Sequence, residues 1–221
     1  MPNVEFIRSR IYNDSAPQPV IKTLPNWYKD ADKYNENKKS TYKNCVSFFE
    51  GMSAGYALVT PCDIEFKIID GVPEVLYDRN AFPSFVEKRP RMNQFHHPEG
   101  YYEDHFAWFP EWGVSLPEGY NALYVTPINR FDLPFVCTSG IINNDKVFRP
   151  GNVPFFLRKG FEGSLPAGTP YLHMLPFARE DWTSSQVDED QKEKTKFFSQ
   201  DDYRLGNNMY REHVWVRTHY T

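Results

Sequence analysis

Proline and glycine interrupt this chain so often that long regular helices have no room in it. The 221 residues include 18 Pro and 12 Gly; proline removes a backbone hydrogen-bond donor, and both residues favour turns. Aromatic residues make up 17% of the chain, and they are enriched in β-strands. The composition therefore predicts short strands joined by turns, and it excludes a helical bundle.

Alternating apolar positions between these turns predict individual strands. Residues 4–10, VEFIRSR, favour an edge strand. The segment CDIEFKIIDGVPEVLYD predicts a hairpin, because Ile64, Phe66 and Ile68 share one face and Asp-Gly at 70–71 is a strong hairpin turn. Five more strand-like segments follow: HFAWFPEWGVSLPEG, YNALYVTPI, LPFVCTSGII, VPFFLRKG and TPYLHMLPFA. Their spacing of roughly ten to fifteen residues is typical of a sandwich or barrel.

We expect a single domain over residues 1–221, divided into three regions. An N-terminal arm with a short helix, a β core and a helical C-terminal extension span 1–45, 46–178 and 179–221. Pro25 is placed to start the short helix. The extension is charged, and Glu180 and Asp181 at its start suit the first turn of a helix.

Charge and cysteine content exclude several classes of protein. The net charge is −4 with both signs interspersed, so no basic stripe is available for general nucleic-acid binding. Cys45, Cys62 and Cys137 are too scattered for a disulfide framework, and reduced thiols are expected. With no signal peptide and no apolar run of about 18 residues, we expect no membrane association. The predicted location is the cytoplasm, that of the host if a phage encodes the protein, or a virion.

Four segments in chain order resemble the β-clip family of deoxyuridine triphosphatases and deoxycytidine triphosphate deaminases. They are SAGYALVTPCDIEF, GYNALYVTPINR, SGIINNDKV and VPFFLRKGFEGSLPAGTPYLHMLPF. The likeness covers about half of the chain and implies a β-clip or jelly-roll-like sandwich. The Met-Ser-Ala-Gly-Tyr signature and the Pro-x-Asn-Arg strand end also resemble a family met in phages and in marine bacteria. No activity follows from that second likeness.

Most catalytic positions of the hydrolases are replaced in this chain. Where the resemblance implies a water-orienting aspartate the chain has Asn143, an amide that cannot accept a proton at neutral pH. The sugar-stacking tyrosine, the phosphate-holding arginine and serine and the aspartate of the opening motif fall on Lys146, Ile128, Asn129 and Ala57. Asp145 remains acidic. The likeness therefore implies the fold without the hydrolysis, and leaves Asn129, Arg130, Asn143 and Asp145 as a polar rim for a ligand.

A second candidate site is a group of potential metal ligands in NQFHHPEGYYEDH. The group consists of His96, His97, Glu99, Glu103, Asp104 and His105. Either His96 with Asp104 or His97 with Glu103, each together with the distant His173, would give two histidines and one carboxylate for Fe or Zn. The alternative is a solvated surface loop, because the spacing fits no helical or hairpin metal motif.

Other single residues also have two interpretations. Arg130 at a strand end can hold a carboxylate or phosphate, or tie that strand end to a loop carbonyl. His173 lies between apolar neighbours and favours an interior position over a ligand. The aromatic segments YYEDHFAWFPEW and FPSF can stack on a base or form the core, and the core is favoured.

These observations leave three hypotheses for the function. The leading one is a non-catalytic, homo-oligomeric protein of phage type, without a cofactor, whose sheets serve assembly or bind a small anionic or nucleotide-like ligand. The second is a metal-dependent oxygenase or hydrolase of the double-stranded β-helix type. The third is a structural component of a virion.

Overall fold

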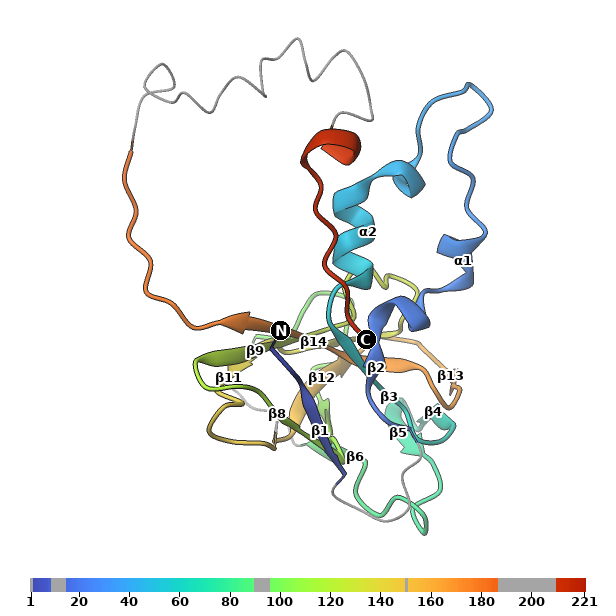
Figure 1. Ribbon diagram of the computed structural model, residues 1–221. Helices are drawn as coiled ribbons and strands as arrows, with labels where there is room; N and C mark the ends of the chain where they lie inside the picture. The colour runs from blue at the N-terminus through green and yellow to red at the C-terminus, as the bar shows by residue number, and fades with distance from the viewer. Residues whose placement is uncertain (1, 9–14, 90–95, 150, 187–209) are drawn as a thin grey trace.

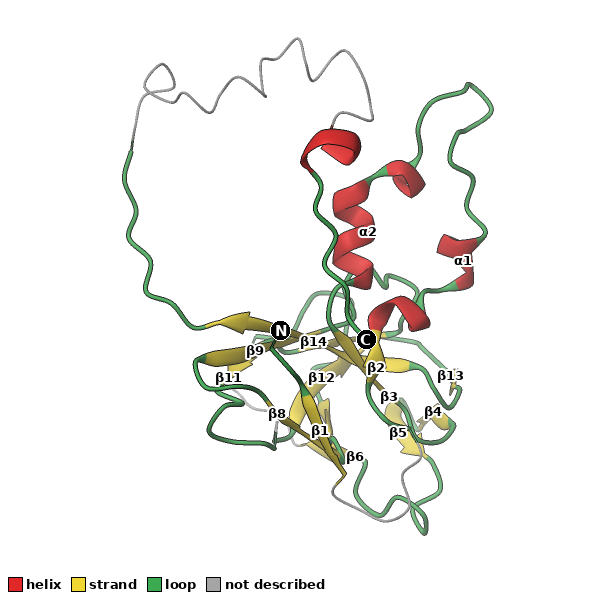
Figure 2. Ribbon diagram, viewed as in Figure 1, coloured by secondary structure: helices red, strands yellow, loops and turns green. Residues whose placement is uncertain are grey.

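Short antiparallel strands form several packed sheets, and only a few short helices accompany them (Figures 1 and 2). The computed structural model describes residues 2–8, 15–89, 96–149, 151–186 and 210–221. The sheets are arranged like a sandwich. The predicted mainly β, sandwich-like fold is therefore confirmed, while the β-clip relationship stays a prediction.

The largest sheet has five strands in the order β11-β9-β14-β3-β2. They are β2 (Gln18–Pro19), β3 (Tyr56–Val59), β9 (Tyr120–Val125), β11 (Gly140–Ile142) and β14 (Pro170–Ala178). The long central strand β14 pairs with β9 on one side and with β3 on the other. Its His173 lies opposite both Val125 and Ala57, so β14 sets the register of the sheet.

Three smaller sheets complete the β structure. The four-stranded sheet has the order β10-β12-β7-β6, the three-stranded sheet β13-β4-β5, and β1 pairs with β8. The bounds are β1 (Glu5–Arg8), β4 (Ile64–Ile69), β5 (Val72–Leu76), β6 (Val86–Arg89), β7 (His105–Trp108), β8 (Trp112–Ser115), β10 (Phe135–Cys137), β12 (Val153–Leu157) and β13 (Gly163–Leu165). Two local predictions are confirmed. Residues 5–8 form a strand, and Asp70 and Gly71, with φ of 52° and 80°, turn β4 into β5.

A stack of buried aromatic rings fills the space between the five-stranded and four-stranded sheets. This aromatic ladder consists of Phe66, Phe106, Trp108, Phe155 and Tyr171. Trp108 of β7 stacks on Phe155 of β12 with ring centroids 4.2 Å apart, and Tyr171 of β14 lies 5.0 Å from Trp108. Phe106 also belongs to the four-stranded sheet, and Phe66 comes from β4 of the three-stranded sheet. Burial of these rings therefore holds three sheets together. The aromatic segment around residue 106 is therefore core, as favoured from the sequence.

The helices cover the opposite face of the five-stranded sheet (Figure 2). They are η1 (Val20–Thr23), α1 (Asn26–Lys29), η2 (Tyr42–Asn44) and α2 (Val46–Ser53). The short helix after Pro25 is thus confirmed. After α2 the chain enters β3 through Gly55, whose φ of 76° suits glycine. Val20, Ala57 and Val59 form a small second apolar cluster on this face.

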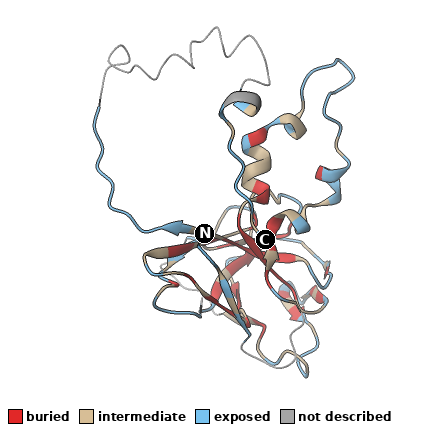
Figure 3. Ribbon diagram, viewed as in Figure 1, coloured by how far each residue is buried: buried red, intermediate tan, exposed pale blue. Residues whose placement is uncertain are grey.

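The C-terminal region differs from the helical extension predicted for it. Residues 179–186 contain no helix and are exposed (Figure 3), so the prediction is wrong there. The Arg179 N–H donates to Gly119 O at 2.7 Å, which continues the extended course of β14, and Thr and Ser favour non-helical backbone. Residues 187–209 of the predicted extension lie outside the described residues. One helical turn, Tyr210–Val214, precedes a segment that runs along α2.

Candidate functional site

The four residues predicted to form a polar rim lie at opposite ends of one strand. Asn129 and Arg130 follow the last residue of β9. Asn143 follows β11, whose Ile142 pairs with Ala122 near the start of β9. A strand of six residues spans about 17 Å between its first and last Cα atoms. The structure therefore does not bring the two pairs together into one site.

Arg130 is engaged in holding the loop after β9 against the helical layer. Its Nε and Nη2 atoms donate to the two carboxylate oxygens of Asp132, both at 2.8 Å, and its Nη1 donates to Thr23 O at 3.2 Å. Trp27 Nε1 donates to the same carboxylate at 3.1 Å. Burial alone raises the pKa of Asp132, but hydrogen bonds from Arg130 and Trp27 bring it below its ordinary value. Of the two interpretations of Arg130, the structure supports the structural tie.

Asp145 is also paired within the fold. Arg179 Nη2 and Nη1 donate to Asp145 Oδ2 and Oδ1 at 2.5 and 3.1 Å, and the Gly119 N–H donates to Oδ2 at 3.0 Å. The Arg179 hydrogen bonds lower the pKa of Asp145 to about 2. Asn143 is exposed, and its carbonyl accepts from the N–H groups of Lys146 and Val147 at 2.9 and 3.0 Å. Both residues shape the turn after β11.

The buried polar residue of this turn is Asn144, which the sequence analysis missed. Asn144 is only 2% exposed. Its Oδ1 accepts from the Tyr124 hydroxyl at 3.0 Å, and its Nδ2 donates to Val114 O at 3.2 Å and Val147 O at 2.9 Å. Burial raises the pKa of Tyr124 above its ordinary value. Asn144 lies two residues after Ile142, so the two-residue alternation of a strand places both side chains on the same face. This spacing is the sequence signal that could have identified Asn144 as an inward-facing residue.

The candidate metal ligands are separated in the structure. His96 is exposed and His97 and Asp104 are partly buried, whereas His173 is 1% exposed within β14. Its Nε2 lies 2.5 Å from Ala54 O, and its Nδ1 is 3.4 Å from the Ile128 N–H donor. Both ring nitrogens are thus used, and burial lowers the pKa of His173. Among the described residues, no three His, Cys, Asp or Glu side chains gather to hold a metal ion.

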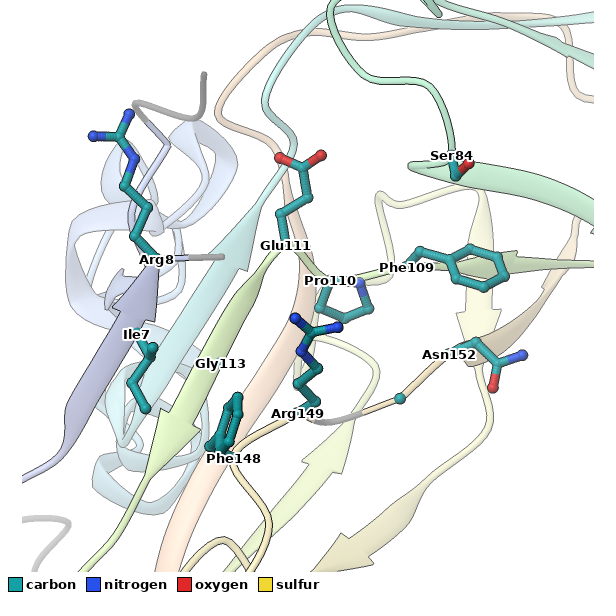
Figure 4. Close-up of a pocket in the computed structure, with 11 residues that line it drawn as sticks. Ile7, Arg8, Ser84, Phe109, Pro110, Glu111, Gly113, Phe148, Arg149 and Asn152 are labelled. Carbon is teal, nitrogen blue, oxygen red and sulfur yellow. The ribbon is translucent and has the colours of Figure 1, made fainter. Parts of the chain in front are cut away.

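A pocket of about 650 Å³ lies where β1 and β8 meet the chain leading into β12 (Figure 4). Its walls come from the end of β1, the residue before Phe85, the turn between β7 and β8, and the segment before β12. The lining residues are Ile7, Arg8, Ser84, Phe109, Pro110, Glu111, Gly113, Phe148, Arg149, Gly151 and Asn152. None of them was a candidate site residue from the sequence, because four distant segments contribute them.

Gly113 allows one wall of this pocket to form. A Cβ at this position would lie 2.9 Å from Phe148 O and 3.1 Å from the Phe148 ring, closer than side chains tolerate. The Val114 N–H donates to Phe148 O at 2.6 Å, which fixes this close approach. As a result the Phe148 ring covers β8, and the neighbouring Arg149 directs its guanidinium toward Pro110 and Glu111 (Figure 4).

The pocket combines apolar walls with fixed charge. Ile7, Phe109, Pro110 and Phe148 supply the apolar surface, and Arg8, Arg149 and Glu111 supply charge. Guanidinium groups bind carboxylate and phosphate through paired hydrogen bonds, and phenyl rings pack against planar groups. The described residues that line the pocket include the Ser84 hydroxyl and no histidine or cysteine.

No model of a known protein family matches the chain, and no curated protein matches it. Among the described residues, no helix is both long and apolar enough to cross a membrane. The structure thus defines a mainly β, sandwich-like protein with a pocket of about 650 Å³ beside β1 and β8.

Proposed function

We propose that this protein is a non-catalytic binding protein that holds a small anionic ligand in the pocket of Figure 4. The observation that supports this proposal most is that Arg149 lines the pocket together with the aromatic residues Phe109 and Phe148. The volume of about 650 Å³ lies within the range of roughly 300–1,000 Å³ common for small-molecule sites. A phosphorylated or carboxylated compound with a planar apolar part matches both features.

The fate of the catalytic positions supports the non-catalytic part of the proposal. Where the resemblance to the hydrolases implies a water-orienting aspartate, the chain has Asn143, and the remaining acid, Asp145, is paired with Arg179. Arg130 is committed to Asp132 and Thr23. A carboxylate whose pKa lies near 2 is a weak base, so Asp145 is poorly suited to activate water at neutral pH.

A thermal-shift screen followed by isothermal titration calorimetry tests the proposal. The probes are inorganic phosphate, deoxynucleoside mono- and triphosphates, and phosphorylated metabolites. We expect saturable stabilisation of the wild-type chain by at least one probe and roughly tenfold or greater loss of affinity in Arg149→Ala, since an arginine–anion pair contributes about 1.5–3 kcal/mol. Arg79→Ala is the matched control, because Arg79 is exposed and rests on Tyr77 away from the pocket.

A second variant separates the two parts of the ligand. Phe148→Ala removes an apolar wall but leaves Arg149 in place, so it should weaken binding of compounds with a ring more than binding of inorganic phosphate. Equal affinity in the wild-type chain and in Arg149→Ala would place the ligand elsewhere. Turnover of any nucleoside triphosphate by the wild-type chain would contradict the non-catalytic assignment.

A further inference from the structure

Residues 179–186 leave the body of the protein as an exposed arm. Residues 180–186 are all exposed, and Trp182 is 86% exposed. The arm begins where Arg179 binds Asp145, at the end of β14, and it runs away from the sheets (Figures 1 and 3). Burial of a large aromatic side chain stabilises proteins and interfaces by several kcal/mol at most, and tryptophan is enriched where proteins meet. A tryptophan held out in this way is suited to docking on another surface.

A hollow of about 240 Å³ beside α2 has the complementary chemistry. This α2 hollow is lined by Tyr28, Lys43, Val46, Phe49, Arg211 and Trp215. Lys43 Nζ lies 4.3 Å from the centroid of the Tyr28 ring and donates to Lys29 O at 3.0 Å. Arg211 Nη2 donates to Asn44 O at 3.4 Å. Lys43 is thus held over an aromatic ring, and Arg211 lines the same hollow.

The charges of the arm and of the α2 hollow are opposite. Glu180 and Asp181 directly precede Trp182, whereas Lys43 and Arg211 stand at the α2 hollow, and within the described residues neither cation forms an ion pair with a carboxylate. Cations attract both carboxylates and the face of an indole. We propose that residues 180–182 of one copy dock in the α2 hollow of a second copy of this chain.

The arm of a second copy is a better candidate for the α2 hollow than the arm of the same chain. In Figure 1 the arm leaves the sheet at the end where β9 and β11 lie and rises there, whereas α2 and the C-terminal segment stand above the opposite end of the sheet. A contact between two different surfaces is heterologous, so a reciprocal exchange closes at two copies and a one-way exchange continues into a ring or chain. The proposal does not depend on the ligand pocket, because no residue is shared between the two sites.

Sedimentation velocity of the full chain over a concentration series is the test. We expect concentration-dependent association in the wild type and a dissociation constant raised roughly tenfold to a hundredfold in Trp182→Ala, as for a central interface tryptophan. Phe131→Ala is the control, because Phe131 is a 75% exposed aromatic residue outside the arm and the α2 hollow. It should associate like the wild type.

A charge exchange identifies the partner surface. The double variant E180K/D181K should lose self-association, and mixing it with an Arg211→Glu variant should restore association between the two. Three outcomes would overturn the proposal: a wild type that stays monomeric throughout, a Trp182→Ala variant that associates unchanged, or a monomer in which Trp182 fluorescence shows a buried indole. The last outcome would assign the α2 hollow to the arm of the same chain.

Discussion

At the scale of single residues, the turn after β11 depends on one amide. Asn144 binds the Tyr124 hydroxyl in β9, Val114 O in β8 and Val147 O beyond the turn. It thereby links the five-stranded sheet to the β1-β8 pair, and its neighbour Phe148 forms the pocket wall. The integrity of the pocket is therefore coupled to a side chain that lines no part of it.

Asn144→Ala should destabilise the fold strongly. The substitution leaves a buried tyrosyl hydroxyl and two carbonyls without this partner, at a cost of about 2–3 kcal/mol. Urea denaturation measures the loss as a lower transition midpoint. Asn143→Ala is the matched control, because the Asn143 side chain is exposed and its removal should change stability by less than about 0.5 kcal/mol. Equal effects at the two positions would contradict this assignment.

Asp145 should make the stability depend on pH in the acid range. Because its pKa falls from an ordinary 3.8 to about 2 in the folded state, the ionised carboxylate favours folding. This contribution is complete above about pH 4 and is lost as the pH falls through about 2. Asp145→Asn should therefore flatten the decline of the urea midpoint between these pH values. An unchanged decline in the variant would show that Asp145 does not carry this dependence.

Sequence alone located polar residues at strand ends but could not identify their partners. Arg130 and Asp132 are near neighbours, so their pairing was open to prediction. Asp145 pairs with Arg179, 34 residues further along the chain. The two residues meet because the start of β9 pairs with the end of β14. Which acid is free for a ligand thus depends on long-range pairing that a single sequence does not reveal.

At the scale of elements, the passage from α2 into β3 depends on glycine. Gly55 has φ of 76°, and a Cβ there would lie 2.3 Å from Met174 O in β14. Gly71 shares the left-handed backbone, with φ of 80°, but has no atom within 4 Å of that position. Gly71→Ala should cost about 1 kcal/mol for backbone strain, and Gly55→Ala about 2 kcal/mol more for the clash. Chemical denaturation of both variants separates the strain contribution from the clash contribution to the free energy of unfolding. Equal losses of stability in the two variants would disprove the clash.

Elements with local signals were predictable, and those set by distant contacts were not. The hairpin at residues 70–71 and the helix after Pro25 both follow from adjacent residues. The acidic start of residues 179–186 suggested a helix, yet the hydrogen bond from Arg179 to Gly119 keeps the chain extended. Tertiary contacts override a weak helical preference there.

At the scale of the whole molecule, residues near both chain ends meet on one tyrosine. Phe6 of β1 and Tyr220 each lie edge-on to Tyr56 of β3, with ring centroids 5.1 and 5.7 Å away. Earlier in the same C-terminal segment, Trp215 Nε1 donates a hydrogen bond of 2.9 Å to Glu50 of α2. The C-terminal segment therefore fastens the helical layer and the sheet to each other.

Removal of the Tyr220 ring should loosen this attachment. Tyr220→Ala loses an edge-to-face contact and partly buried apolar area, which together contribute about 1–2 kcal/mol. The expected result is a lower melting temperature. Val216→Ala, at an 87% exposed position of the same segment, should melt like the wild type. A melting temperature unchanged by Tyr220→Ala would indicate that the segment contributes no stability.

The aromatic ladder gives this protein a built-in optical signature of correct packing. Trp108 is completely buried and stacked on Phe155 at 4.2 Å, so its indole is fixed in an asymmetric environment. Rigid aromatic side chains produce near-ultraviolet circular dichroism, whereas the far-ultraviolet signal reports the strands. A compact state that keeps its strands but loses the packing between its sheets would lose the near-ultraviolet signal and retain the far-ultraviolet signal. Spectroscopy can thus distinguish whether a variant has lost its strands or only the registry of the rings between them.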